Sequence, residues 1–177
     1  MYLINDYYNN IVKYDLINKF YYQNITQLPK IKKIILTFNF KKQTLKNLMS
    51  SLIALELIST QKPIFVKSKI SNITLKIRKG QPVGCKLTLR KSKVNFFIFK
   101  LWNDFFYSKN YVEKNIKIKT SNISVFSFQI QNSLIFSELE TNYQIFKQLT
   151  KLNITIVCTS KTFKELKFLL KSYKLFF

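Results

Sequence analysis

Residues 76–90 read Lys-Ile-Arg-Lys-Gly-Gln-Pro-Val-Gly-Cys-Lys-Leu-Thr-Leu-Arg, and this stretch contains both glycines of the chain. Average usage would give roughly a dozen glycines in 177 residues. Glycine is required where φ is positive or where another backbone approaches closely. We therefore expect a specially shaped loop here, bracketing Pro82. An ordinary hairpin turn is the alternative, and the basic tip with Arg78 and Lys79 favours a functional loop.

The residues on both sides of this loop alternate between apolar and polar, as strands with one buried face do. Ile73, Leu75 and Ile77 alternate with polar residues before the loop, and Cys85, Leu87 and Leu89 do so after it. Pairing the two strands is predicted to place Arg78 opposite Lys86, Lys76 opposite Thr88, and Thr74 opposite Arg90. Like charges directly opposite destabilise a free sheet, so this face favours contact with phosphate. A merely solvated charged face is the alternative.

The periodicity of apolar residues along the whole chain predicts an α+β domain in which helices pack on one face of a mainly antiparallel sheet. Four helices are expected. The first is N-terminal, with Tyr8, Val12, Leu16 and Phe20 at regular spacing, and the second begins at about Thr44, with Leu45, Leu48, Met49, Leu52 and Leu55 on one face. The third covers 93–107, and the last is capped by Thr162 and Glu165 and buries Leu166, Leu169, Leu170 and Tyr173. The other expected strands are 34–40, 64–69, 126–130 and 154–157, and residues 108–122 are expected to form a lysine-rich loop. Residues 1–177 are predicted to be one domain, its N-terminal half the binding sheet and its C-terminal half completing the layer.

Charge indicates the kind of partner. Thirty Lys plus Arg stand against eight Asp plus Glu, giving a net charge of +22. A chain this basic repels itself, and nucleic acid neutralises it while releasing condensed counterions. A membrane-surface protein is a second hypothesis, but it predicts one long amphipathic basic helix, whereas lysines here also occupy strands and loops. No stretch resembles a membrane span, so no membrane partner is expected.

An enzyme is the third hypothesis, and the sequence supplies little for it. The chain has no histidine and two cysteines, so neither a histidine base nor a four-cysteine zinc site is present. Its acids are scattered, with Glu138 and Glu140 the exception, and no phosphate-binding glycine loop occurs. We expect no catalytic residue, no metal and no cofactor. Cys85 and Cys158 are expected to be reduced.

The order of several motifs resembles the large-subunit ribosomal protein family numbered five. The matching residues are Asp6-Tyr7-Tyr8, Val12, Leu16, Phe20, Tyr22, Gln27, Pro29, Lys33-Ile34, Leu36, Gln61-Lys62-Pro63, Ile77-Arg78, Gly80, Pro82, Gly84-Cys85-Lys86, Thr88-Leu89-Arg90, Ile135-Phe136, Leu152, Ile154-Thr155-Ile156 and a terminal Phe. Each match is weak alone, but the ordered set covers nearly the whole chain.

The resemblance implies a non-catalytic, structural constituent of the large ribosomal subunit that binds 5S rRNA in the central protuberance. In this family a Gln before Lys-Pro and a Thr after the Gly-Cys turn hydrogen-bond the RNA, which corresponds to Gln61 and Thr88. The usual Asn of the first strand is Thr37 here, and Asn39 is a candidate substitute. The expected 5S rRNA-binding set is Thr37, Asn39, Gln61, Lys67, Lys69, Lys86, Thr88 and Arg90. The loop expected to reach the P-site tRNA is Arg78, Lys79, Gly80, Gln81, Pro82, Val83 and Gly84.

Other partners implied by the resemblance are large-subunit rRNA and neighbouring proteins of the central protuberance. The family's pattern is absent over 108–133, so a bridge to a small-subunit head protein stays an open alternative. Abundant Lys, Asn, Ile, Phe and Tyr indicate an A/T-rich genome, and no transit peptide precedes the first helix. We therefore expect a mitochondrial ribosome in the matrix, with a plastid-type organelle or a bacterium as alternatives.

Overall fold

A six-stranded antiparallel sheet forms the centre of the molecule, in the order β2-β3-β1-β6-β5-β4. The computed structural model describes residues 3–40, 45–106, 116–122 and 124–175. The strands are β1 (Ile31–Asn39), β2 (Ile64–Lys67), β3 (Pro82–Leu89), β4 (Ile116–Asn122), β5 (Val125–Ile130) and β6 (Leu152–Cys158). The central strand β1 pairs with β3 and β6, which both come later in the chain.

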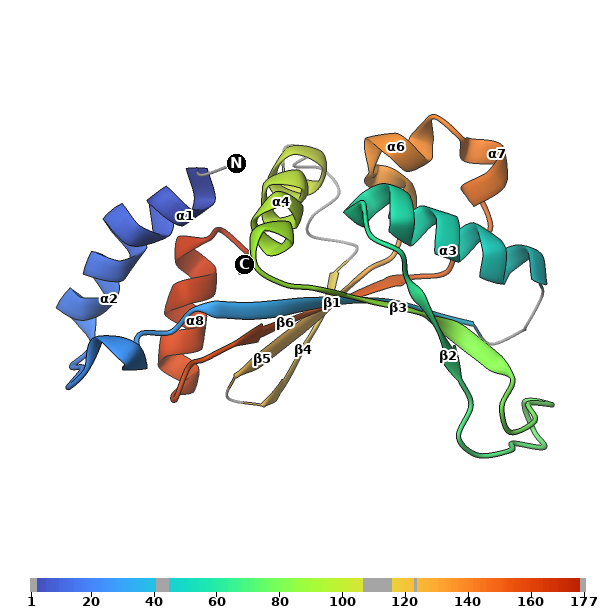
Figure 1. Cartoon of the computed structure of the whole chain (residues 1–177), viewed down its shortest axis with the longest axis horizontal. Helices are drawn as coiled ribbons and strands as arrows, with labels where there is room; N and C mark the ends of the chain where they lie inside the picture. Colours follow the sequence, from blue (N-terminus) through green and yellow to red (C-terminus); the bar gives the residue numbers. More distant parts are fainter. Residues whose placement is uncertain (1–2, 41–44, 107–115, 123, 176–177) are drawn as a thin grey trace.

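The helices gather over one side of this sheet, as Figure 1 shows. The α-helices are α1 (Leu3–Tyr7), α2 (Lys13–Lys19), α3 (Leu45–Ser59), α4 (Ser92–Lys100), α6 (Ser137–Glu140), α7 (Tyr143–Phe146) and α8 (Phe163–Ser172). Short π-helical or 3-10 segments are η1 (Tyr8–Val12), η2 (Ile25–Gln27), η3 (Leu101–Phe106) and η4 (Ser133–Ile135). The prediction of an α+β fold with helices on one face of an antiparallel sheet is confirmed.

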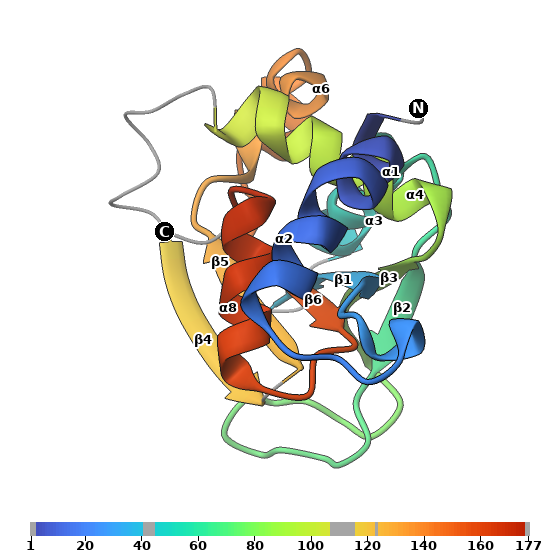
Figure 2. The same cartoon turned by 90° about the vertical axis from the view of Figure 1, so that its left-hand side faces the viewer.

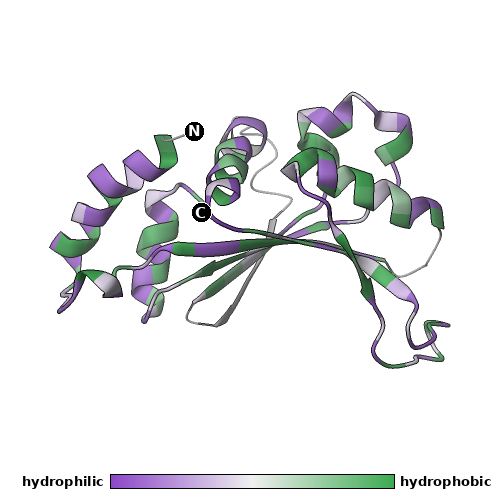
Figure 3. Cartoon of the chain, viewed as in Figure 1, coloured by the Kyte–Doolittle hydropathy of each residue, from purple (hydrophilic) through white to green (hydrophobic). Residues whose placement is uncertain are grey.

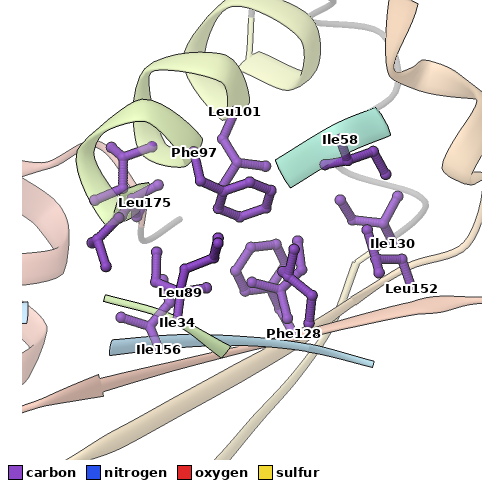
Figure 4. Close-up of a cluster of buried hydrophobic side chains, with 14 of the residues drawn as sticks. Ile34, Ile58, Leu89, Phe97, Leu101, Phe128, Ile130, Leu152, Ile156 and Leu175 are labelled. Atoms are coloured by element: carbon purple, nitrogen blue, oxygen red, sulfur yellow. The ribbon is translucent and has the colours of Figure 1, made fainter. Parts of the chain in front are cut away.

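The core lies between the helices and the covered face of the sheet. Strands β1, β3, β5 and β6 present buried apolar residues to this face; in β1 these are Ile34, Leu36 and Phe38, all fully buried. Phe97 of α4 and Phe128 of β5 belong to the same cluster of buried apolar side chains (Figure 4). Apolar burial of this extent is the main favourable term in folding, and it fixes which face each strand leaves uncovered.

The C-terminal helix α8 is fixed by a capping box, and the residue after it is held by a long-range hydrogen bond. The Thr162 side chain accepts from the backbone N–H of Glu165, whose carboxylate accepts from the Thr162 backbone, so the predicted capping box of α8 is confirmed. The indole of Trp102 donates to the carbonyl of Tyr173 at 2.9 Å. Figure 2 shows α8 beside α2, close to the β5–β6 side of the sheet.

The predicted pairing of residues 73–77 with β3 is wrong. The hairpin is instead formed by β2 and β3, with Ile64 opposite Lys86 and a connecting loop at 68–81. Lys86 and Thr88 therefore do not face Arg78 and Lys76. Within the loop the chain folds back on itself through an Asn72–Ile77 bridge, and Lys76 has a φ of 53°. That left-handed conformation interrupts a strand, and Ile73 is 93% exposed, so its alternation with Leu75 does not reflect burial.

The two glycines also have different roles from the one expected. Gly80 lies in the loop with a φ of 89°, where L residues are strained. Pro82, Val83 and Gly84 belong to β3 rather than to the loop tip. Gly84 is buried against β1, where a Cβ would collide with the carbonyl oxygen of Phe38. Gly80 therefore allows the backbone conformation of the loop, and Gly84 allows β3 to approach β1 closely.

Two further predictions need correction. The buried face of α3 contains Leu48, Ser51, Leu55 and Ile58, whereas Leu45 is 77% exposed; Met49 is exposed as well. This helix carries apolar residues on more than one face, so periodicity alone could not select the buried one. Residues 116–122 form β4 by pairing with β5 instead of a loop, and 108–115 lie outside the described residues. The short helices η4, α6 and α7 are additional elements that the sequence pattern does not predict.

Both cysteines are buried free thiols, as expected for a reduced protein. Burial raises the pKa of the Cys158 thiol to about 12, and burial also raises the pKa of Cys85. Because the thiolate is the reactive species, we expect iodoacetamide at pH 8 to label the folded protein far more slowly than the urea-unfolded one. Mass spectrometry over time checks this, and equal labelling rates would contradict the burial of both thiols.

Candidate nucleic-acid interface

The face of the sheet opposite the helices carries hydroxyl, amide and basic side chains. Thr37 in β1 lies opposite Lys86 in β3, and on its other side opposite Asn153 in β6. Asn153 in turn lies opposite Gln129 in β5. This row, Lys86–Thr37–Asn153–Gln129, crosses four strands, and all four residues are partly exposed. We call this side of the sheet the polar face.

A second row runs parallel to the first, one pair further along the strands. Thr88 in β3 lies opposite Ile35, which lies opposite Thr155, which lies opposite Ser127. The Gln61 side chain, at the end of α3, donates to the carbonyl oxygen of Thr88 at 3.4 Å. The structure thus brings the predicted residues Gln61 and Thr88 together, two residues along β3 from Lys86. Asn39 lies opposite Gly84 and is exposed at the end of β1.

The remaining predicted RNA-binding residues lie at the borders of the polar face. Arg90 is exposed directly after β3, and Lys67 is exposed at the end of β2. Lys69 is exposed in the loop between β2 and β3. The eight residues predicted to bind 5S rRNA therefore occupy β1, the β2–β3 hairpin and their flanks. Lys67 and Lys69 extend the set toward the loop and lie away from the paired rows.

The loop between β2 and β3 has a closed neck and an exposed tip. The backbone N–H of Ser68 donates to the carbonyl of Gln81 at 2.8 Å, and the N–H of Gly80 donates back to Ser68 at 3.0 Å. The Ser68 hydroxyl donates to the Arg78 carbonyl at 2.6 Å, and the Arg78 N–H donates to the Gln81 side chain at 2.9 Å. Arg78, Lys79 and Gly80 are exposed. The neck therefore holds the basic residues outward, and Figures 1 and 2 show the loop standing away from the helices.

Hydropathy along this loop is mixed, as Figure 3 shows. Ile70 is 80% exposed and Ile73 is 93% exposed beside the basic residues Lys69, Lys76 and Lys79. Single exposed apolar side chains are common on protein surfaces, so it is the basic residues of this loop that indicate a partner.

Half of the polar face lies outside the predicted site. The predicted residues belong to β1, the β2–β3 hairpin and their flanks, whereas Asn153 and Thr155 of β6 and Ser127 and Gln129 of β5 continue the same rows. Their signal was present in the alternation of these residues with buried Phe126, Phe128, Ile154 and Ile156. The sequence did not predict the strand order, which places β6 beside β1 and β5 beside β6.

The described residues offer little for chemistry other than binding. They contain no group of three or more His, Cys, Asp or Glu residues placed to hold a metal ion. Across the ranges that the structure describes, no helix has the length and apolar character needed to cross a membrane. The polar face instead presents short hydroxyl and amide groups with lysine, which suits contact with phosphate and sugar groups.

Comparison with known proteins identifies the class of protein to which this chain is similar. The family profile for the C-terminus of the ribosomal L5 family matches residues 82–177. Large ribosomal subunit protein uL5m of Reclinomonas americana is 35% identical over 175 residues, covering 97% of this chain and 96% of the relative. Large ribosomal subunit protein uL5 of Nitrosomonas eutropha is 37% identical over 179 residues, covering 96% and 94%; the Nitrosomonas europaea protein of the same name is 34% identical over 182 residues, covering 96% and 94%.

These matches and the fold define a structural protein of the large ribosomal subunit, which is not an enzyme. Within that class, the chain belongs to the ribosomal L5 family. The resemblance noted from the ordered motifs is thereby confirmed.

Proposed function

We propose that this chain binds 5S rRNA in the central protuberance of the large ribosomal subunit through the polar face of its sheet. The observation that carries the proposal is the clustering of Thr88, Lys86 and Thr37 on adjoining strands, with Gln61 bonded to Thr88, on the side that no described helix covers. Hydroxyl and amide groups can hydrogen-bond to ribose 2′-hydroxyls, while lysine neutralises phosphate. We further propose that residues 1–177 act as one domain in this role.

We also propose that the loop between β2 and β3 extends toward the P-site tRNA. Its closed neck supports this role, since the hydrogen bonds of Ser68 with Arg78 and Gln81 fix the base from which the basic tip projects. The loop differs from the predicted segment, because Pro82, Val83 and Gly84 belong to the strand below it. Arg78, Lys79, Gly80 and Gln81 are therefore the residues that we propose for tRNA contact.

The remaining partners and the location follow from the same family. Large-subunit rRNA and neighbouring ribosomal proteins are the partners that a large-subunit protein implies. The uL5m relative supports the mitochondrial ribosome as the location, although bacterial uL5 proteins also match. A small-subunit bridge stays an open alternative, because residues 108–115 lie outside the described part of the chain.

Replacing Gln61 and Thr88 together by alanine is expected to weaken binding to 5S rRNA by about tenfold or more, since each lost hydrogen bond typically contributes about 1 kcal/mol. The control replaces the exposed lysines Lys62 and Lys91 by alanine, and we expect a smaller loss of about threefold because exposed charge contacts are weak. Filter binding with bacterial 5S rRNA at fixed ionic strength measures both. Equal losses in the two double variants would contradict the proposed site.

A further inference from the structure

A hollow of about 760 Å³ opens at the end of the sheet where β1 and β5 end and β6 begins. Its size falls within the range of roughly 300–1,000 Å³ that is usual for pockets holding small ligands. Apolar side chains of Phe40 and Leu149 contribute to its wall. Around them stand five carboxamide side chains, those of Asn39, Asn47, Gln129, Gln131 and Asn153.

Two polar atoms in this hollow are buried without a hydrogen-bond partner among the described residues. They are the side-chain oxygen Oδ1 of Asn153 and the hydroxyl oxygen Oγ1 of Thr150. A buried acceptor that lacks a partner is unfavourable, so the two atoms identify a place where a ligand donor would be stabilising. Both residues line the hollow.

The hollow is continuous with the polar face. Asn153 lies opposite Thr37 on one side and opposite Gln129 on the other. Thr37 lies opposite Lys86, which belongs to the proposed 5S rRNA surface. An RNA strand that follows the row from β3 to β5 therefore arrives at the hollow without leaving the protein.

The chemistry of the lining matches an unpaired nucleotide. A carboxamide carries a donor beside an acceptor, which is the arrangement that pairs in two-pronged fashion with an adenine edge. Phe40 and Leu149 supply apolar surface for the ring, and exposed Lys151 at the rim can neutralise the adjoining phosphate. Proteins that recognise RNA sequence typically hold such splayed-out bases by stacking and by hydrogen bonds to their edges. None of the lining residues is a carboxylate, so the hollow does not suit a cation.

We propose that this hollow receives an unpaired adenine nucleotide of the ribosomal RNA that covers the polar face. The proposal rests on the proposed function, since that RNA delivers the nucleotide. It adds a base-reading site to a surface that otherwise contacts mainly sugar and phosphate.

The test uses the full chain, labelled with ¹⁵N, and follows the side-chain NH₂ resonances of Asn153 and Gln129 by NMR. Single-stranded hexa-adenylate is expected to shift both resonances and to bind about fivefold more tightly than hexa-uridylate, which corresponds to roughly one additional hydrogen bond. A six-base-pair RNA duplex is expected to shift backbone resonances of β3, and to shift the resonances of these two side chains less than hexa-adenylate does. Unchanged Asn153 and Gln129 resonances, or equal affinity for the two hexanucleotides, would overturn the proposal.

A matched variant separates the hollow from general charge attraction. Asn153→Leu with Gln129→Leu keeps the side-chain size and the net charge while removing both amides. We expect its affinity for hexa-adenylate to fall about fivefold, to the level of hexa-uridylate, with a smaller loss for the RNA duplex, whose paired bases cannot enter the hollow. If this variant does not fold, the spectra of the unmodified protein decide the question alone.

The two proposals fail in distinguishable ways. The Gln61→Ala and Thr88→Ala double variant is expected to lose affinity for 5S rRNA while keeping the hexa-adenylate response of Asn153. A retained 5S rRNA affinity in that variant counts against the proposed function only. A missing hexa-adenylate response in a protein that binds 5S rRNA counts against the nucleotide site only.

Discussion

Gly84→Ala is expected to lower the free energy of unfolding by about 2–3 kcal/mol, the cost of overpacking a buried site. The added Cβ would collide with the Phe38 carbonyl oxygen and approach the Asn39 side chain within 3.2 Å. Gly84 is paired with Asn39 on one side and with Val66 on the other, so β3 cannot move away from β1 without disturbing its pairing with β2. Because the collision involves backbone atoms, a change of rotamer cannot relieve it.

Urea unfolding followed by fluorescence measures this loss, since Trp102 is the chain's single tryptophan and its indole is hydrogen-bonded to Tyr173 in the core. Gly80→Ala is the matched control. No atom lies within 4 Å of a Cβ at Gly80, and only its φ of 89° opposes the change. We expect a smaller loss of about 1 kcal/mol there. A Gly84→Ala midpoint equal to that of the unmodified protein would show that the two strands do not approach as described.

The affinity for 5S rRNA is expected to fall by about a thousandfold between 50 and 200 mM salt if six or more phosphates are neutralised. The net charge of +22 and the exposed basic residues around the hairpin support a count of this size. Replacing Lys86 and Arg90 by glutamine should reduce the slope of log affinity against log salt by about 2, roughly 1 for each lost phosphate contact. Filter binding over a series of salt concentrations gives the slope.

The control for this measurement replaces Lys164 and Lys171 by glutamine. Both are exposed on α8, whose buried residues belong to the core on the covered side of the sheet. This variant loses the same two charges as the Lys86 and Arg90 variant, yet we expect its slope to stay unchanged. If the two variants reduce the slope equally, binding follows overall charge and the polar face is not the contact surface.

The sequence predicted the parts of this fold that depend on clear local signals. Buried and exposed residues alternate in β1, β3, β5 and β6 as expected, and the capping box fixes the start of α8. Prediction failed where an alternation of apolar and polar residues occurs in an exposed loop as well as in strands with one buried face. Ile73, Leu75 and Ile77 alternate like a strand, but they belong to a loop in which Ile73 and Leu75 are exposed rather than packed.

The part of the candidate surface that lies on β1 and β3 was predicted from the sequence, and the part on β5 and β6 was not. The alternation within β1 and β3 predicts that Thr37, Lys86 and Thr88 lie on the uncovered face, whereas the expected RNA contacts of Gln61, Thr88 and Thr37 came from the family resemblance. Asn153 and Gln129 join the surface only because β6 and β5 extend the sheet beyond β1. No local pattern encodes that neighbourhood, since it depends on pairing between segments that are distant in the chain.

The position of β1 in the sheet determines when, during synthesis of the chain, the sheet can be completed. Both neighbours of β1 are made after it, and β6 is the last strand of the sheet to be synthesised. A nascent chain that lacks β6 leaves one edge of β1 unpaired. The polar face is thus complete only after the last strand of the described sheet has been synthesised.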